Sequence, residues 1–320
     1  MKLPILLALF QAGFQAGPEV YDGRAGHTVI PVVQFNDPAN VDAIRIDGRL
    51  DEQLWIDAAV LTGFSQYSPQ DGLPAQDSTR VRVWYSPQAL YFGIEAFADP
   101  ASVRATLADR DRIDADDQVL LLIDTFDDAR RALVFGVNPL GIQLDGTRVE
   151  GEGSRSFFAA EDDALPLDRN PDYVFESAGQ VTPFGFQVEV RIPFKTLPYQ
   201  WADVQDWGLN VVRIVQATGH SHTWTAARQG RSSFLAQSGT LSGLTNLQRG
   251  LVLDMTPVVT ARAVGAPLAD GAWDYTRDGP EVGGSVRWGI TENVTLNGTV
   301  NPDFSQVEAD AEQLVFDPRS

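Results

Sequence analysis

The chain has 320 residues, a formal net charge of −19 at pH 7 and no cysteine. The excess of acidic residues argues against nucleic-acid binding, because proteins that bind phosphate backbones concentrate Lys and Arg. The lack of cysteine excludes disulfides, thiolate metal sites and cysteine nucleophiles. A chain of this length favours two domains and can bury a large core.

Residues 1–17 resemble a secretory signal peptide. Lys2 is followed by the apolar run LPILLALF, which is too short to form a transmembrane helix. We therefore expect an exported protein, and a disordered apolar terminus is the alternative.

The next segments predict short strands and one short helix. Thr28–Val33 has the composition of a first strand. Asp51 and Glu52 open a short helix, because acidic side chains are favourable in a first helical turn. Thr79–Tyr85 and Leu90–Phe97 are predicted to form a hairpin.

The central prediction is a second hairpin, formed by Gln118–Thr125 and Arg131–Val137. Both runs are short and apolar on both faces, which places them in the middle of a sheet that is covered on each side. We expect their side chains to be mainly buried, in particular Leu121, Ile123, Leu133 and Phe135.

Three further strands are predicted at Phe184–Ile192, Trp207–Gln216 and Ser221–Arg228. In the first of these, apolar and polar residues alternate, and Glu189 falls on the polar face with the character of an inert surface acid. The count of strands predicts an all-β fold, an antiparallel, jelly-roll-like β-sandwich.

Six segments in order carry a family resemblance: IDGRLDEQLW, ALYFGIEA, DDQVLLLIDTF, VFGVNPLGIQLDG, VEVRIPFKTL and WGLNVVRI. Together they resemble the family 9 carbohydrate-binding module, in the version that precedes an outer-membrane β-barrel in bacterial proteins. The resemblance covers Ile44 to Leu244. It implies a sugar-binding sandwich over residues 28–247, with structural calcium and a location in the periplasm or outer membrane of a Gram-negative bacterium, where it would serve carbohydrate catabolism.

A saccharide site needs a flat aromatic platform with polar side chains at its edge. The candidates are Trp84, Trp207 and Trp224, with Arg213 as the polar partner. The pattern VRVWYS puts Trp84 on the face that we expect to meet solvent. For each tryptophan taken alone, a place in the core is the simpler interpretation.

Calcium requires several converging oxygen ligands. Asp114, Asp116 and Asp117 form one of the two richest local supplies of carboxylates, and we assign calcium to this one; a solvated acidic turn is the alternative. His220 and His222 lie two residues apart and are interpreted as a polar hairpin tip.

Two other classes of function remain open. A glycoside hydrolase needs two carboxylates across a cleft, and no pair stands out in the sequence. A structural or gating module of an outer-membrane protein would bind no sugar.

Residues 251–320 change in character. Segments such as NVTLNGTV alternate apolar and polar residues, as transmembrane barrel strands do. Because 70 residues supply too few strands to close a barrel, we expect the first antiparallel strands of an incomplete β-barrel, with one edge and one apolar face uncovered. The saccharide, the barrel and the membrane are the expected partners.

Overall fold

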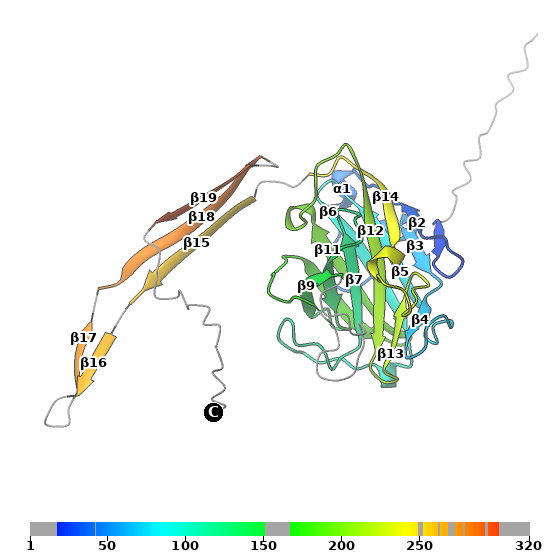
Figure 1. Ribbon diagram of the computed structural model, residues 1–320, viewed down its shortest axis with the longest axis horizontal. Coiled ribbons are helices and arrows are strands. Elements are labelled where there is room, and N and C mark those ends of the chain that lie inside the picture. Colours follow the sequence, from blue (N-terminus) through cyan, green and yellow to red (C-terminus); the bar gives the residue numbers. More distant parts are fainter. Residues whose placement is uncertain are drawn as a thin grey trace, which may run out of the picture. The chain divides into compact units, whose positions relative to one another are not determined.

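The computed structural model describes residues 18–41, 43–150, 167–248, 252–261, 263–267, 273–277, 279–291 and 294–300 (Figure 1). The predicted signal peptide at residues 1–17 lies outside this part of the chain. Two compact units are present, residues 1–248 and 249–320. Among the described residues, no helix is long and apolar enough to cross a bilayer.

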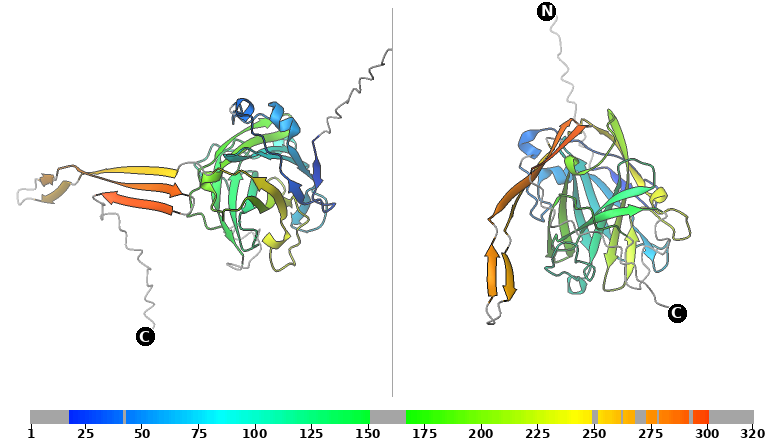
Figure 2. Two further views of the ribbon diagram at one scale, coloured as in Figure 1. Left: turned by 90° about the horizontal axis from the view of Figure 1, so that it is seen from above. Right: turned by 60° about the vertical axis from the view of Figure 1, so that its left-hand side comes forward.

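The first unit is a β-sandwich of two sheets (Figure 1; Figure 2). The first sheet has six strands, in the order β1 (Val20–Asp22), β3 (Ala59–Thr62), β5 (Thr79–Tyr85), β6 (Ala89–Phe97), β11 (Gly185–Pro193) and β10 (Glu176–Thr182). The second contains β2 (Val29–Pro31), β14 (Gly239–Thr245), β12 (Val204–Val215), β7 (Gln118–Asp124), β8 (Arg131–Val137) and β9 (Gln143–Val149), with β13 (His220–Thr223) and β4 (Ser65–Ser68) attached beside β12.

The pairing is antiparallel except at two edges. Strands β1 and β3 pair in parallel, and so do β2 and β14. The sandwich also begins earlier than predicted, because β1 at Val20 belongs to the first sheet. The short helices are α1 (Pro38–Val41) and α2 (Gln53–Asp57), with 3-10 turns at Pro100–Ser102, Phe194–Thr196 and Leu235–Gln237.

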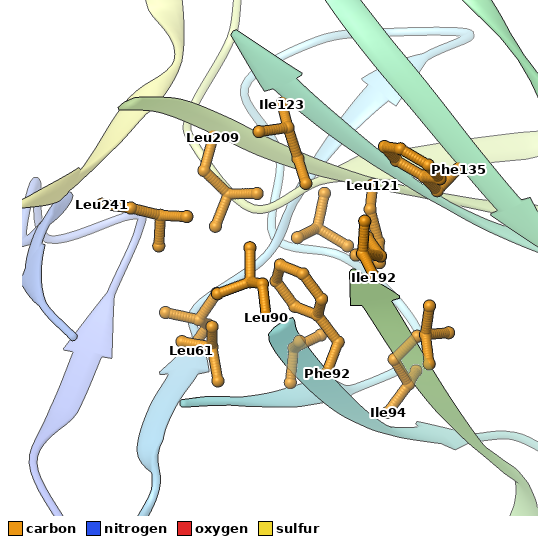
Figure 3. Packing of buried hydrophobic residues seen from close by; sticks show 14 of the residues in the cluster. Leu61, Leu90, Phe92, Ile94, Leu121, Ile123, Phe135, Ile192, Leu209 and Leu241 are labelled. Carbon is orange, nitrogen blue, oxygen red and sulfur yellow. The ribbon is translucent and has the colours of Figure 1, made fainter. Parts of the chain in front are cut away.

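The central hairpin is confirmed. Strands β7 and β8 pair antiparallel, with Leu121 opposite Phe135 and Ile123 opposite Leu133, and all four side chains are buried. The main core lies between the sheets, where side chains of β7 and β12 meet those of β6 and β11 (Figure 3).

The outer faces of both sheets are covered as well. Residues 35–58 lie on the first sheet, and loops from both halves of the unit lie on the second. The cover of the first sheet forms a cluster of Leu54, Trp55, Ala58, Trp84, Ala89 and Tyr91. The second sheet carries Leu120, Leu122, Val134, Leu144 and Val212 beneath Ile113, Phe234 and Leu235. This unit therefore has more than two layers.

The second unit contains two small antiparallel sheets. One is formed by β15 (Val252–Thr260), β18 (Glu281–Thr291) and β19 (Val294–Val300). The other pairs β16 (Ala263–Pro267) with β17 (Trp273–Arg277), which continue the hairpin beyond β15 and β18 (Figure 1). The described strands do not close into a barrel.

Candidate functional site

The sequence-based placement of Trp84 on a solvent-facing surface is wrong. Its ring is fully buried, stacked on Tyr91 at 3.9 Å between centroids and in edge contact with Trp55 at 5.8 Å. The residue does lie on the outer face of its sheet, but the cover of residues 35–58 encloses that face. Gly93 permits the close approach, because a Cβ there would come within 2.6 Å of Leu50 and 2.9 Å of Trp55.

Trp207 and Trp224 are also core residues rather than saccharide platforms, and both are fully buried. Trp207 packs between Phe194 and Tyr199. Trp224 donates its indole N–H to the carbonyl of Tyr21, 3.3 Å away. That carbonyl belongs to β1, the strand that the sequence pattern missed.

Arg213 is buried and crosses the sandwich. Its guanidinium donates to the carbonyls of Ser78 and Phe97 at 2.9 and 3.0 Å and to the hydroxyl of Thr79 at 3.1 Å. Burial lowers the pKa of Arg213, while Asp77 and Asp117 act in the opposite direction. Arg213 therefore ties β12 of the second sheet to β5 and β6 of the first.

The three carboxylates predicted to bind calcium do not converge. Asp114 forms an exposed ion pair with Arg169 at 2.6 Å. Asp116 accepts from the hydroxyl of Thr106 and from the amide of Asn138.

Asp117 accepts from the backbone N–H of Gln216 at 2.7 Å. Because the oxygens of Asp114, Asp116 and Asp117 serve separate protein donors, these residues do not fit a common calcium site.

Another group of acids does approach within 4.8 Å, formed by Asp111, Asp145 and Asp172. The guanidinium of Arg110 already binds Asp145 in this group. Calcium binding stays a prediction.

Glu189 is not the surface acid that its alternation indicates. Its carboxylate is buried and accepts from the backbone N–H groups of Asp47 and Gly48, each at 2.8 Å, and from the indole N–H of Trp55 at 3.0 Å. Burial raises the pKa of Glu189 to about 7, against the opposing effect of these donors. The residue fastens the cover of residues 35–58 to the first sheet.

His222 is fully buried, so the interpretation of a polar hairpin tip is wrong for this residue. Neither ring nitrogen has a hydrogen-bond partner among the described residues. Burial, with a contribution from the neighbouring Arg213, lowers the pKa of His222 to about 4.

Two grooves open on the described surface of the first unit. The Tyr91 groove, of about 490 Å³, is lined by Asn36, Pro38, Val41, Ile44, Ile46, Pro87, Gln88, Tyr91, Glu176 and Arg191. The aromatic ring at the bottom of this groove is almost inaccessible, because Tyr91 is only 3% exposed. Its two charged side chains, Arg191 and Glu176, form an ion pair with each other at 2.6 Å.

The Phe97 groove, of about 610 Å³, is lined by Asp22, Arg24, Ala25, Thr62, Gly63, Phe64, Pro74, Ala75, Ser78, Thr79, Arg80 and Phe97. Phe97 is partly exposed and packs against Phe184 at 5.3 Å. The guanidinium of Arg80 lies 5.6 Å from the centre of the Phe97 ring. The exposed side chain of Arg24 makes no ion pair or hydrogen bond with the described residues.

The Phe97 groove is the stronger candidate, because Arg213 fixes its wall from beneath. The three groups that accept from Arg213 belong to Ser78, Thr79 and Phe97, which all line the groove. The strand ends meet there because Thr79 of β5 is paired with Ala96 of β6. Sequence reasoning identified this hairpin but gave no signal for Asp22, the last residue of β1, or for Arg24 in the turn that follows.

Comparison with known proteins gives a family match in the second unit. Residues 252–319 match a family described as "Domain of unknown function (DUF5916)". A search of curated protein sequences found no match.

Solved structures similar to this chain include a family 9 carbohydrate-binding module of Caldicellulosiruptor kristjanssonii in complex with cellotriose. It has 15% identity and a TM-score of 0.41 over 66% of this chain and 91% of the other. A glucose complex of a family 9 module from the same organism has 13% identity and a TM-score of 0.40, covering 63% and 92%. At these TM-scores the likeness carries no argument about function, and the sandwich assignment rests on the pairing of the strands.

Proposed function

We propose that residues 18–248 form an exported, non-catalytic saccharide-binding module that precedes strands of an outer-membrane β-barrel. The observation that carries the saccharide part is the Phe97 groove. It combines a partly exposed aromatic ring with guanidinium, carboxylate and hydroxyl groups. These are the groups that match the apolar face and the hydroxyl rim of a pyranose.

The rigidity of the groove supports this assignment. Arg213 holds both strands that form the wall, so little ordering is needed when a ligand binds. Its volume lies within the usual range of small-ligand sites.

The lining of the groove favours binding over hydrolysis. A glycosidase needs two carboxyl groups across the scissile bond, about 5–10 Å apart. Among the described lining residues, Asp22 supplies the one carboxylate.

The membrane part rests on the second unit. In its larger sheet one face is apolar and the other mostly polar, with strands of seven to eleven residues. This alternation is typical of strands that separate lipid from a polar interior.

A glycan array with purified residues 18–248 tests the saccharide assignment, in the presence and absence of calcium. This segment has its own core and sheets, so it is suitable as an isolated domain. For a saccharide that binds, Arg24→Ala is expected to weaken affinity about tenfold, since a hydrogen bond to a charged group contributes roughly 1.5–3 kcal/mol.

Arg130→Ala is the matched control, because Arg130 is also exposed but does not line the groove. Equal affinity of the Arg24 and Arg130 variants would remove the Phe97 groove from the site. An array with no bound glycan would favour the structural or gating role.

A further inference from the structure

The larger sheet of the second unit has one uncharged, apolar face. Met255 stands opposite Val286 and Trp288 opposite Leu296, and paired residues project from the same side of a sheet. Seven side chains on this face are between 37% and 75% exposed: Met255, Val259, Val282, Val286, Trp288, Leu296 and Val300. The opposite face presents Thr256, Ser285, Arg287, Asn297 and Thr299, together with Val258.

The connections between strands differ in length at the two ends of this sheet, and the end with the shorter connection is called the short end. At one end, β18 stops at Thr291 and β19 starts at Val294. Strand β15 begins at the same end, where Val252 pairs with Gly289. At the other end, the β15–β18 hairpin is extended by β16 and β17.

Exposed aromatic residues lie towards both ends. Trp288 is close to the short end. On the extension, Trp273 and Tyr275 are 58% and 60% exposed. Both rings lie across Gly265, where an added Cβ would come within 3.0 Å of Tyr275 and 3.2 Å of Trp273.

The spacing of these aromatics fits a bilayer. The chain from Tyr275 to Trp288 would extend over roughly 40 Å as a strand, or about 30 Å of depth at the usual tilt of barrel strands. Transmembrane barrels have an apolar band about 25 Å tall between two aromatic girdles, with short periplasmic turns and longer loops outside the cell.

We infer that the apolar face of β15, β18 and β19 contacts the lipid hydrocarbon of the outer membrane and that the β16–β17 hairpin, with Trp273 and Tyr275, lies at the outer surface of the cell. This inference rests on the proposed attachment to the outer membrane. The short end, where the chain enters β15 from the first unit, is the periplasmic end. Lipid fits this face because the face carries no charge and the opposite face is mostly polar.

Single-cysteine labelling tests the inference in the full-length protein, produced in a Gram-negative cell. Because this sequence has no cysteine, each substitution introduces the only thiol of these 320 residues. With a maleimide too large to cross the outer membrane, Tyr275→Cys is expected to be labelled on intact cells. Ser232→Cys, in an exposed loop of the first unit, is expected to be labelled only after the outer membrane is opened.

A matched pair tests the lipid-facing surface. Ser285 and Val286 are neighbours on opposite faces of β18. A small, water-soluble maleimide is expected to label Ser285→Cys and to leave Val286→Cys unlabelled until the protein is unfolded in detergent. Labelling of Val286→Cys in the membrane would overturn the assignment of this face to lipid.

Fractionation separates failure of the inference from failure of the proposed function. If the protein sediments with outer membranes but Tyr275→Cys is labelled only after opening, the orientation is wrong and the membrane attachment stands. If Ser232→Cys is labelled on intact cells, the orientation is wrong as well. Recovery of the protein in the soluble fraction would overturn both the lipid contact and the membrane part of the proposed function.

Discussion

The two units are built from the same kind of strand, yet the apolar faces of their strands differ in burial. In the sandwich, strand β7 is buried at all seven positions, because the second sheet is covered on both faces. In the second unit, Met255 and Val300 remain 67% and 75% exposed on an apolar face. Alternation therefore defines which face of a strand is apolar, but it does not say what covers that face.

The strongest test of this contrast is a matched pair of substitutions. Leu121→Ala in the covered sheet is expected to cost about 2–5 kcal/mol, because it leaves a cavity in a packed core. Leu296→Ala in the uncovered sheet, where the side chain is 54% exposed, is expected to change the free energy of unfolding in water by less than about 0.5 kcal/mol.

Urea unfolding of the 320-residue chain measures both variants. Similar losses from the two substitutions would show that the apolar face of β18 and β19 is covered in solution, and would break the comparison.

A second test addresses how the cover of residues 35–58 is held. The pKa of Glu189 is raised to about 7 by burial. A carboxyl with a raised pKa binds its proton more tightly in the folded state, so its contribution to stability is complete below the unfolded pKa, near 4.5, and is lost as the pH rises through 7.

Glu189→Gln is expected to remove this pH dependence, which amounts to as much as about 3 kcal/mol between pH 4.5 and 7.5. The measurement is the free energy of unfolding at both pH values. Glu176→Gln, on the neighbouring strand β10, controls for the general loss of a negative charge. An unchanged slope in the Glu189 variant would show that Glu189 does not titrate in this range.

The smallest expected effect concerns His222. Its pKa is lowered to about 4, so the folded state binds the proton less tightly than the unfolded state does. Stability therefore falls as the pH drops from about 6.5 towards 4. On acidification, this loss of stability opposes the gain that comes from Glu189. The buried ring also leaves its polar atoms without partners among the described residues, which costs roughly 1–3 kcal/mol.

His222→Leu is therefore expected to raise the stability at pH 7 by about 1 kcal/mol and to remove the loss at acidic pH. His220→Leu, at a partly exposed position on the same strand, is the control. Destabilisation by His222→Leu at pH 7 would indicate that the ring nitrogens have partners in solution.

The sequence predicted much of the first unit and little of its candidate site. The strands Thr79–Tyr85 and Arg131–Val137 were predicted with the observed bounds, since composition and turn residues act locally. The pairing of β1 was missed because a three-residue strand carries too little pattern. The Phe97 groove was missed because its wall joins the loop after β1 to the ends of β5 and β6.

The sequence by itself determined the all-β class, the central hairpin and the apolar face of the last strands, because a strand alternates with a period of two residues. Only the tertiary structure decided which alternating faces are covered. Trp84 is enclosed partly by Trp55, 29 residues earlier in the chain, and the donors to Glu189 lie more than 130 residues before it. Contacts over such distances leave no periodic signal in either strand, so a buried tryptophan, glutamate or arginine has the same local pattern as an exposed one.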